Sequence, residues 1–207
     1  MNTSANPPVQ PRSVQRGLMA ALLGWPGIVI AAAWGFAEAT LFFIIPDLVL
    51  TLAAAFSVRR SLLHVVSAII GGVLGGLVMF GWASKSPQEA NRTVASVPLV
   101  RMEMFERVES HFERAGVWGL CLGPTSGIPY KVYAVRAPAH AKALHFGLVS
   151  IPARAERLFI TWAQFALLGV VVRRLWPRRA DLVLACVFVV YWLVAYGLYF
   201  HSIPKGL

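Results

Sequence analysis

Three long stretches with almost no charged side chains constrain the fold of this chain more than any other feature. Residues 61–84 and 182–204 contain no Asp, Glu, Lys or Arg, and residues 17–58 contain only Glu38 and Asp47. A helix needs about 20 apolar residues to cross the hydrocarbon core of a bilayer. Charged residues make up 14% of the chain, against about 25% in an ordinary soluble domain. Together these observations predict an all-α integral membrane protein.

The same pattern divides the chain into segments. Residues 1–15, rich in Pro, Asn, Ser and Gln, are expected to form a disordered tail, and residues 16–207 a single membrane domain. In residues 98–115, apolar side chains recur at helical spacing beside glutamates, which is typical of an amphipathic helix with a solvated charged face. The other expected parts are a first helix with a re-entrant hairpin (17–57), a transmembrane helix (61–83), a second re-entrant hairpin (117–150) and two transmembrane helices (153–172 and 182–200).

Two of the apolar segments are interrupted by Pro and an ionisable residue. Pro46–Asp47 interrupts the first, and the stretch GPTSGIPYKVYAV (123–135) contains Gly127, Pro129 and Lys131. Irregular backbone at membrane depth is tolerated only where it packs within protein or lines a wet cavity. Each interrupted segment is followed by a full helix, which is the pattern of two inverted repeats in a transporter. We therefore expect both segments to dip into the membrane and to meet there.

The candidate charged residues for a shared internal site are Glu38 and Asp47 from the first half, and Lys131, Arg154 and Arg157 from the second. An isolated charge at the bilayer centre costs about 2.5–3.5 kcal/mol on insertion scales, so pairing is expected. Three cations against two carboxylates leave one surplus positive charge, which suits a phosphate headgroup that Arg can hold through two hydrogen bonds. Two alternatives stay open: the arginines reach the headgroup region, or Glu38 and Lys131 lie in aqueous loops.

The net charge of +10 does not indicate a nucleic-acid partner, because the basic residues gather at the ends of the apolar stretches. This placement is typical of cytoplasmic loops that face anionic lipid, and it serves as a topology signal or as a lipid-binding surface. No metal-ligand spacing and no nucleophile–base pair is apparent in the sequence, so we expect no cofactor, no metal and no enzymatic activity. The clustered residues are Arg12, Arg16, Arg59, Arg60, Arg173, Arg174, Arg178 and Arg179.

The stretches GFAEATLFFIIPDLVL (35–50) and GGVLGG (71–76) resemble the DedA family of membrane proteins, also called the VTT or SNARE-associated Golgi protein family, and its small bacterial branch in particular. Glu38 and Pro46–Asp47 match the family's two acidic positions, with Asp in place of the usual Glu. GIPYK (127–131) and ARAER (153–157) match its Pro/Gly turn and its basic helix start. Lys131 stands where Arg is usual, and the Pro–Gly order is inverted.

The resemblance implies two re-entrant hairpins and a role in moving lipids across the bilayer of the cell membrane (inner or plasma membrane), coupled to protons. We expect a multi-pass flippase or scramblase for phospholipid or polyprenyl phosphate, and a homo-oligomer is compatible with it. The headgroup is expected at Lys131, Arg154 and Arg157 beside the turn at Gly127 and Pro129. Protons are expected at Glu38 and Asp47. The alternatives are a proton-coupled transporter of a small soluble solute, a membrane-embedded enzyme and a structural membrane partner.

Overall fold

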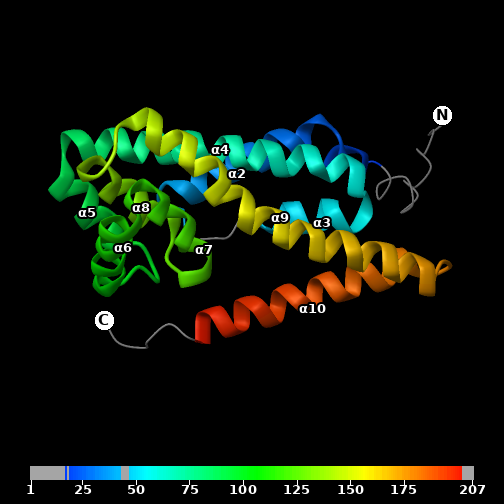
Figure 1. Ribbon diagram of the computed structural model, residues 1–207. Coiled ribbons are helices and arrows are strands. Elements are labelled where there is room, and N and C mark those ends of the chain that lie inside the picture. Colours follow the sequence, from blue (N-terminus) through cyan, green and yellow to red (C-terminus); the bar gives the residue numbers. More distant parts are fainter. Residues whose placement is uncertain (1–16, 18, 43–46, 202–207) are drawn as a thin grey trace, which may run out of the picture.

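The computed structural model describes residues 17, 19–42 and 47–201, and these residues form an all-helical protein without β-strands (Figure 1). Side chains are described for 17, 19–42 and 49–198. Three helices are long and apolar enough to cross a membrane: α4 (Val58–Lys85), α9 (Ala143–Leu175) and α10 (Ala180–His201). At this level the expected fold, an all-α protein with membrane-spanning helices, is confirmed.

The helix α9 differs from the expected helix 153–172 because it begins at Ala143 and contains Pro152 in its interior. The 33 residues of α9 correspond to about 50 Å at a rise of 1.5 Å per residue. Proline removes one backbone donor, but membrane helices tolerate it where neighbouring groups satisfy the freed carbonyl. Residues 143–150 thus belong to this helix rather than to the second interrupted segment. Arg154 and Arg157 therefore lie well inside a long helix.

Two shorter helices pack against the first half of α4. The helix α2 (Trp25–Ala39) runs alongside α4, and their backbones approach closely at small residues. A Cβ atom added to Gly71 would lie 2.0 Å from Ala32 O, and one added to Gly75 would lie 2.6 Å from Phe36 O. The helix α3 (Asp47–Phe56) runs back toward the beginning of α4.

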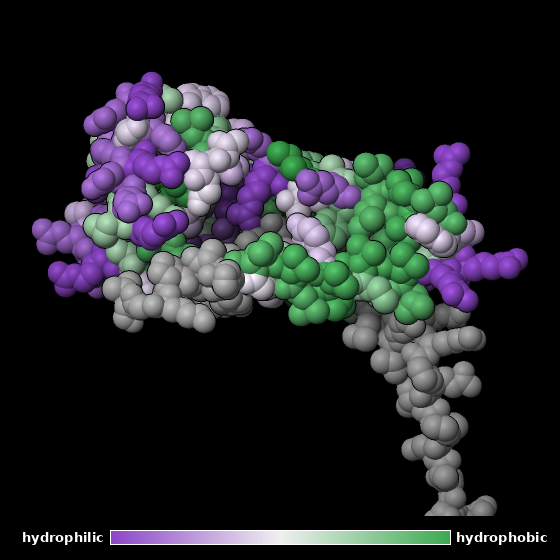
Figure 2. All heavy atoms as spheres, turned by 90° about the horizontal axis from the view of Figure 1, so that it is seen from below, coloured by the Kyte–Doolittle hydropathy of each residue, from purple (hydrophilic) through white to green (hydrophobic). Residues whose placement is uncertain are grey.

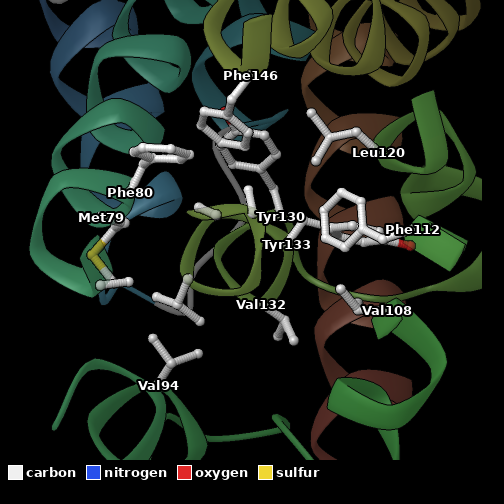
Figure 3. Packing of buried hydrophobic residues seen from close by; sticks show 14 of the residues in the cluster. Met79, Phe80, Val94, Val108, Phe112, Leu120, Tyr130, Val132, Tyr133 and Phe146 are labelled. Carbon is white, nitrogen blue, oxygen red and sulfur yellow. The ribbon is translucent and has the colours of Figure 1, made fainter. Parts of the chain in front are cut away.

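The remaining elements gather around the later part of α4 (Figure 1), and α5 (Pro87–Ala95) and α6 (Met102–Ala115) make this the polar end of the molecule. Its amphipathic helix is shorter than the expected 98–115 and buries Phe105, Val108 and Phe112. These side chains join the largest apolar cluster, with Tyr133 and Phe146 from the segments that follow (Figure 3). The other elements are the 3-10 helix η1 (Gly116–Leu122), α7 (Gly123–Ser126), α8 (Tyr130–Arg136) and the 3-10 helix η2 (Ala137–Ala139).

Polar and apolar side chains separate along the length of the molecule. Figure 2 shows hydrophilic side chains over the α5–α6 end, an apolar surface over the other half, and hydrophilic side chains again at the far end. The helix α10 lies along this apolar half beside α9, and Trp192 Nε1 donates to Thr51 Oγ1 of α3 at 3.2 Å. An apolar zone between two polar ends is the distribution expected of a protein that crosses a bilayer.

Candidate functional site

A buried ion pair joins α2 to α9. Glu38, in the last turn of α2, places Oε2 2.6 Å from Nη2 of Arg154 on α9. The Arg154 and Glu38 side chains are only 6% and 8% exposed. Burying two charges is costly unless they pair closely, so this contact holds the two helices in one relative position.

A second arginine faces the same carboxylate. Nη1 of Arg157 lies 3.8 Å from Oε1 of Glu38, and the Arg157 side chain is half-buried. Residues three apart on a helix lie on nearly the same face, which explains why Arg154 and Arg157 reach one partner. Among the residues whose side chains the structure describes, one carboxylate therefore faces two guanidinium groups.

The glycine pairs of GGVLGG give the site its space. The first glycine of each pair, Gly71 or Gly75, faces α2, whereas the second faces the site. A Cβ atom added to Gly72 would lie 2.7 Å from Arg154 Nε, and one added to Gly76 would lie 2.2 Å from Tyr130 Oη. Two glycine repeats of the small-xxx-small type therefore interleave on α4, one for helix packing and one for the site.

Tyr130, at the beginning of α8, supports Arg154 from another side. The guanidinium carbon of Arg154 lies 4.9 Å from the centre of the Tyr130 ring, within the range of a cation–π contact. The Tyr130 hydroxyl donates to Ser150 Oγ at 2.7 Å, and Ser150 in turn donates to Phe146 O at 2.7 Å. The ring is therefore fixed by a chain of buried hydrogen bonds that ends on α9 itself.

Lys131 is buried, but its hydrogen bond goes to a carbonyl oxygen rather than to a carboxylate. Its Nζ donates to Phe42 O, just after α2, at 2.6 Å. The turn before it follows the sequence closely, because Gly127 has φ +70° in the left-handed region and Pro129 precedes the first residue of α8. The two interrupted segments thus meet at this bond, although sequence alone pointed to an acidic partner.

The structure brings Glu38, Arg154 and Arg157 together and places Lys131 at the neighbouring junction. The side chain of Asp47 lies outside the described residues. Sequence reasoning did not single out Tyr130, Ser150 or the site-facing glycines as site residues. The sequence did contain one signal for these residues. GGVLGG has two adjacent glycines in each half, so it can present small residues on two sides of the helix, one toward α2 and one toward the site.

A second charged cluster lies at the polar end. Glu109 of α6 accepts hydrogen bonds from Nε (3.0 Å) and Nη2 of Arg136, and His140 Nε2 lies 2.7 Å from its other oxygen. Burial alone would raise the pKa of Glu109, but the hydrogen bond and charge of Arg136, together with His140, lower it below its ordinary value. The His140 ring also stacks on Phe112 at 4.7 Å. These contacts hold α6 against the end of α8 and the segment that follows it.

No protein-family model matches this chain, and no curated protein or solved structure matches it. The resemblance to the DedA family therefore stays a prediction from its short motifs.

Proposed function

We propose that the protein moves a lipid with a phosphate headgroup, either a phospholipid or a polyprenyl phosphate, across the cell membrane in which it is a multi-pass protein. The phosphate binds between Arg154 and Arg157 with Lys131 close by, while the lipid chains stay in the bilayer. One observation carries this proposal: two guanidinium groups, those of Arg154 and Arg157, converge on the buried carboxylate of Glu38 beside helices that are apolar enough to span a membrane. Two guanidinium groups in one place suit an anion with several oxygen atoms.

The donors around the site support an anion with several oxygen atoms. Arg154 Nε has no hydrogen-bond partner among the described residues, although the side chain is almost fully buried. A guanidinium group presents its donors in a planar fork that matches a phosphate. The half-buried Arg157 borders the buried pair, so a headgroup can contact Arg157 before it reaches Arg154.

We further infer that the two interrupted segments act as re-entrant hairpins related as inverted repeats. The helices α2 and α3 have 15 and 10 residues, or roughly 22 and 15 Å, too short for a hydrocarbon core about 30 Å thick. The second hairpin would comprise η1, α7 and α8, and end before α9. Support comes from the bond between Lys131 and Phe42 O, which joins the first turn of α8 to the irregular backbone just after α2. Such backbone is tolerated at membrane depth inside protein.

Protonation of Glu38 supplies the coupling to pH in this proposal. The ionised carboxylate occupies the position in which a phosphate would contact Arg154 and Arg157. Adding a proton removes its charge, weakens both contacts and releases the arginines for the headgroup. Asp47 keeps the same role in the proposal on the basis of its sequence position. Transport is therefore expected to be faster at acidic pH.

The proposal can be tested by reconstituting the protein in vesicles and following fluorescent phospholipid or polyprenyl phosphate between the leaflets as a function of pH. Arg157→Ala is expected to slow transport at every pH, because one phosphate contact is removed. Glu38→Gln is expected to weaken the pH dependence, because the amide cannot titrate and only Asp47 keeps the proton-coupling role. Arg92→Ala, an exposed arginine of α5, is the matched control and is expected to transport normally.

Unchanged rates and unchanged pH dependence in both site variants would refute the mechanism. Each variant is first checked for monodisperse purification and for helical content by circular dichroism, so that misfolding is not read as loss of transport. If vesicles instead accumulate a soluble organic phosphate, and lipid does not compete with that uptake, the substrate is a small solute rather than a lipid.

A further inference from the structure

Exposed arginines gather at one end of the molecule, remote from the polar α5–α6 end. They come from the beginning of α4 and from the connection between α9 and α10. These two parts lie at the same end because Arg173, near the end of α9, donates to the carbonyl oxygens of Ala55 and Phe56, just before α4 begins at Val58. Asp181 is the one acidic residue in ranges 58–60 and 173–181. The exposed arginines of this arginine end are Arg59, Arg60, Arg174, Arg178 and Arg179.

Arg173, which the sequence groups with them, has a different role. Its guanidinium group donates to the carbonyl oxygens of Ala55 (2.6 Å) and Phe56 (3.2 Å) at the end of α3, and also to Gly169 O at 3.2 Å. It also lies 5.7 Å from the Phe56 ring. The last carbonyls of a helix lack partners within that helix, and a cation there is favourable. Arg173 therefore caps α3, whereas its neighbours point to the exterior.

Two exposed tryptophans accompany the arginine end. Trp176 lies between the arginines of the α9–α10 connection, and Trp25 begins α2 next to the start of α4. Beyond them the large exposed side chains of α4, α9 and α10 are mostly apolar. Tryptophan concentrates at the level of lipid headgroups, and arginines just beyond that level attract anionic lipid. Along the molecule, an apolar surface is therefore followed by tryptophans and then by arginines, which is the order that suits a negatively charged membrane surface.

We propose that the arginine end binds the headgroups of an anionic phospholipid surface, and that Arg174, Arg178 and Arg179 supply much of the attraction while Arg173 does not. This inference is independent of the proposed transport, because it uses neither Glu38 nor the arginines of the buried site. It also assigns both arginine-rich connections to one side of the membrane, the side with the more anionic leaflet.

The test is a titration of the detergent-solubilised protein with phosphatidylglycerol or phosphatidylcholine, followed by native mass spectrometry. Both lipids contain a phosphate, but only phosphatidylglycerol carries a net negative charge. The difference between their affinities therefore measures the contribution of that net charge. Each arginine near an anionic surface is worth about fivefold in affinity. The triple variant Arg174→Gln/Arg178→Gln/Arg179→Gln is therefore expected to lose preference for phosphatidylglycerol on the order of a hundredfold. Added salt is expected to reduce the wild-type preference.

Two controls make the outcome decisive. The variant Arg92→Gln/Arg101→Gln/Arg107→Gln removes equal charge from the polar end and is expected to keep the preference. Arg173→Gln is expected to lower thermal stability with little change in lipid preference. Retained preference in the arginine-end triple variant, or an equal loss in the polar-end triple variant, would overturn the inference.

Discussion

The molecule contains two clusters in which one glutamate faces two basic side chains, and they differ chiefly in their surroundings. Glu38 with Arg154 and Arg157 lies between helices, and the Glu38–Arg154 side chains are 8% and 6% exposed. Glu109 with Arg136 and His140 lies at the polar end, where the Glu109 and Arg136 side chains are 30% and 35% exposed. The Glu38–Arg154 pair is therefore out of water, whereas Arg157 and both members of the Glu109–Arg136 pair are partly exposed.

The supporting residues differ accordingly. Around the buried cluster, Gly72 and Gly76 leave room for Arg154 and Tyr130, and hydrogen bonds hold the Tyr130 ring. Around the exposed cluster, support comes mainly from the stacking of His140 on Phe112. A buried charge needs a prepared environment because water cannot compensate it. We interpret the buried cluster as the site that acts on a ligand and the exposed cluster as a clamp between α6 and the segment after α8.

The largest expected difference between the two clusters appears when the glutamate of each is removed. Glu38→Leu leaves Arg154 buried without its carboxylate and is expected to cost about 3–5 kcal/mol of unfolding free energy. Glu109→Leu removes a partly exposed pair and is expected to cost about 0.2–1 kcal/mol. Unfolding in mixed detergent micelles, followed by circular dichroism, measures both. Equal losses would show that the two clusters do not differ in effective burial.

A double replacement sharpens that result. Glu38→Leu/Arg154→Leu removes both charges, and a buried pair replaced by apolar side chains is often neutral or stabilising. The double variant is therefore expected to be more stable than Glu38→Leu alone. If it is equally unstable, the cost of Glu38→Leu comes from packing rather than from an unpaired arginine.

The next effect concerns the glycine faces of α4. Gly76→Ala places a methyl group where Tyr130 Oη lies only 2.2 Å away, and overpacking of this kind costs about 1–3 kcal/mol. Gly81→Ala, on the same helix with no atom within 4 Å, is expected to be neutral or to stabilise by up to about 1 kcal/mol. Thermal unfolding of the two variants in one detergent gives the comparison. A neutral Gly76→Ala would mean that Tyr130 can move away freely.

A smaller effect is expected at the tyrosine itself. Tyr130→Phe keeps the ring under Arg154 but removes the hydroxyl that donates to Ser150, at a cost of about 0.5–1.5 kcal/mol. Tyr191→Phe, at an exposed position of α10, is the control and is expected to change stability by less. The same unfolding assay applies. If Tyr130→Phe loses no more stability than Tyr191→Phe, the Tyr130 hydroxyl does not help to stabilise the buried cluster.

Much of the fold could be predicted from the sequence, because apolar length and charge placement determine which helices can enter a membrane. The joint approach of Glu38, Arg154 and Arg157 follows from the cost of isolated charges and from the spacing of the arginines. Two features could not be read in this way. Pro152 suggested the start of a helix, yet α9 begins at Ala143 and continues through Pro152. Lys131 suggested a carboxylate partner, whereas a carbonyl oxygen in irregular backbone serves instead.

The exposed cluster was missed for a different reason. The glutamates of 98–115 repeat on one helical face, and such a repeat normally marks a solvated surface. Nothing in the local pattern distinguishes Glu109 from Glu106 or Glu113, because its partners Arg136 and His140 come from a later segment. Local periodicity identifies the polar face of a helix, but the partner of a given side chain on that face depends on tertiary packing.

The smallest expected effect is the pH dependence of the stability that Glu109 contributes. The pKa of Glu109 is lowered in the folded protein, so its contribution to stability is present above the ordinary glutamate pKa and is lost as pH falls through the lower, folded value. The stability difference between wild type and Glu109→Gln is therefore expected to be at most about 1 kcal/mol near neutral pH, since the pair is partly exposed, and to shrink in acid. Thermal unfolding of both proteins between neutral and acidic pH measures it, and added salt should reduce the neutral-pH difference. A stability difference that stays constant with pH and salt would mean that Glu109 stabilises the protein through packing. The two clusters would then differ in how their side chains pack rather than in how exposed their charges are.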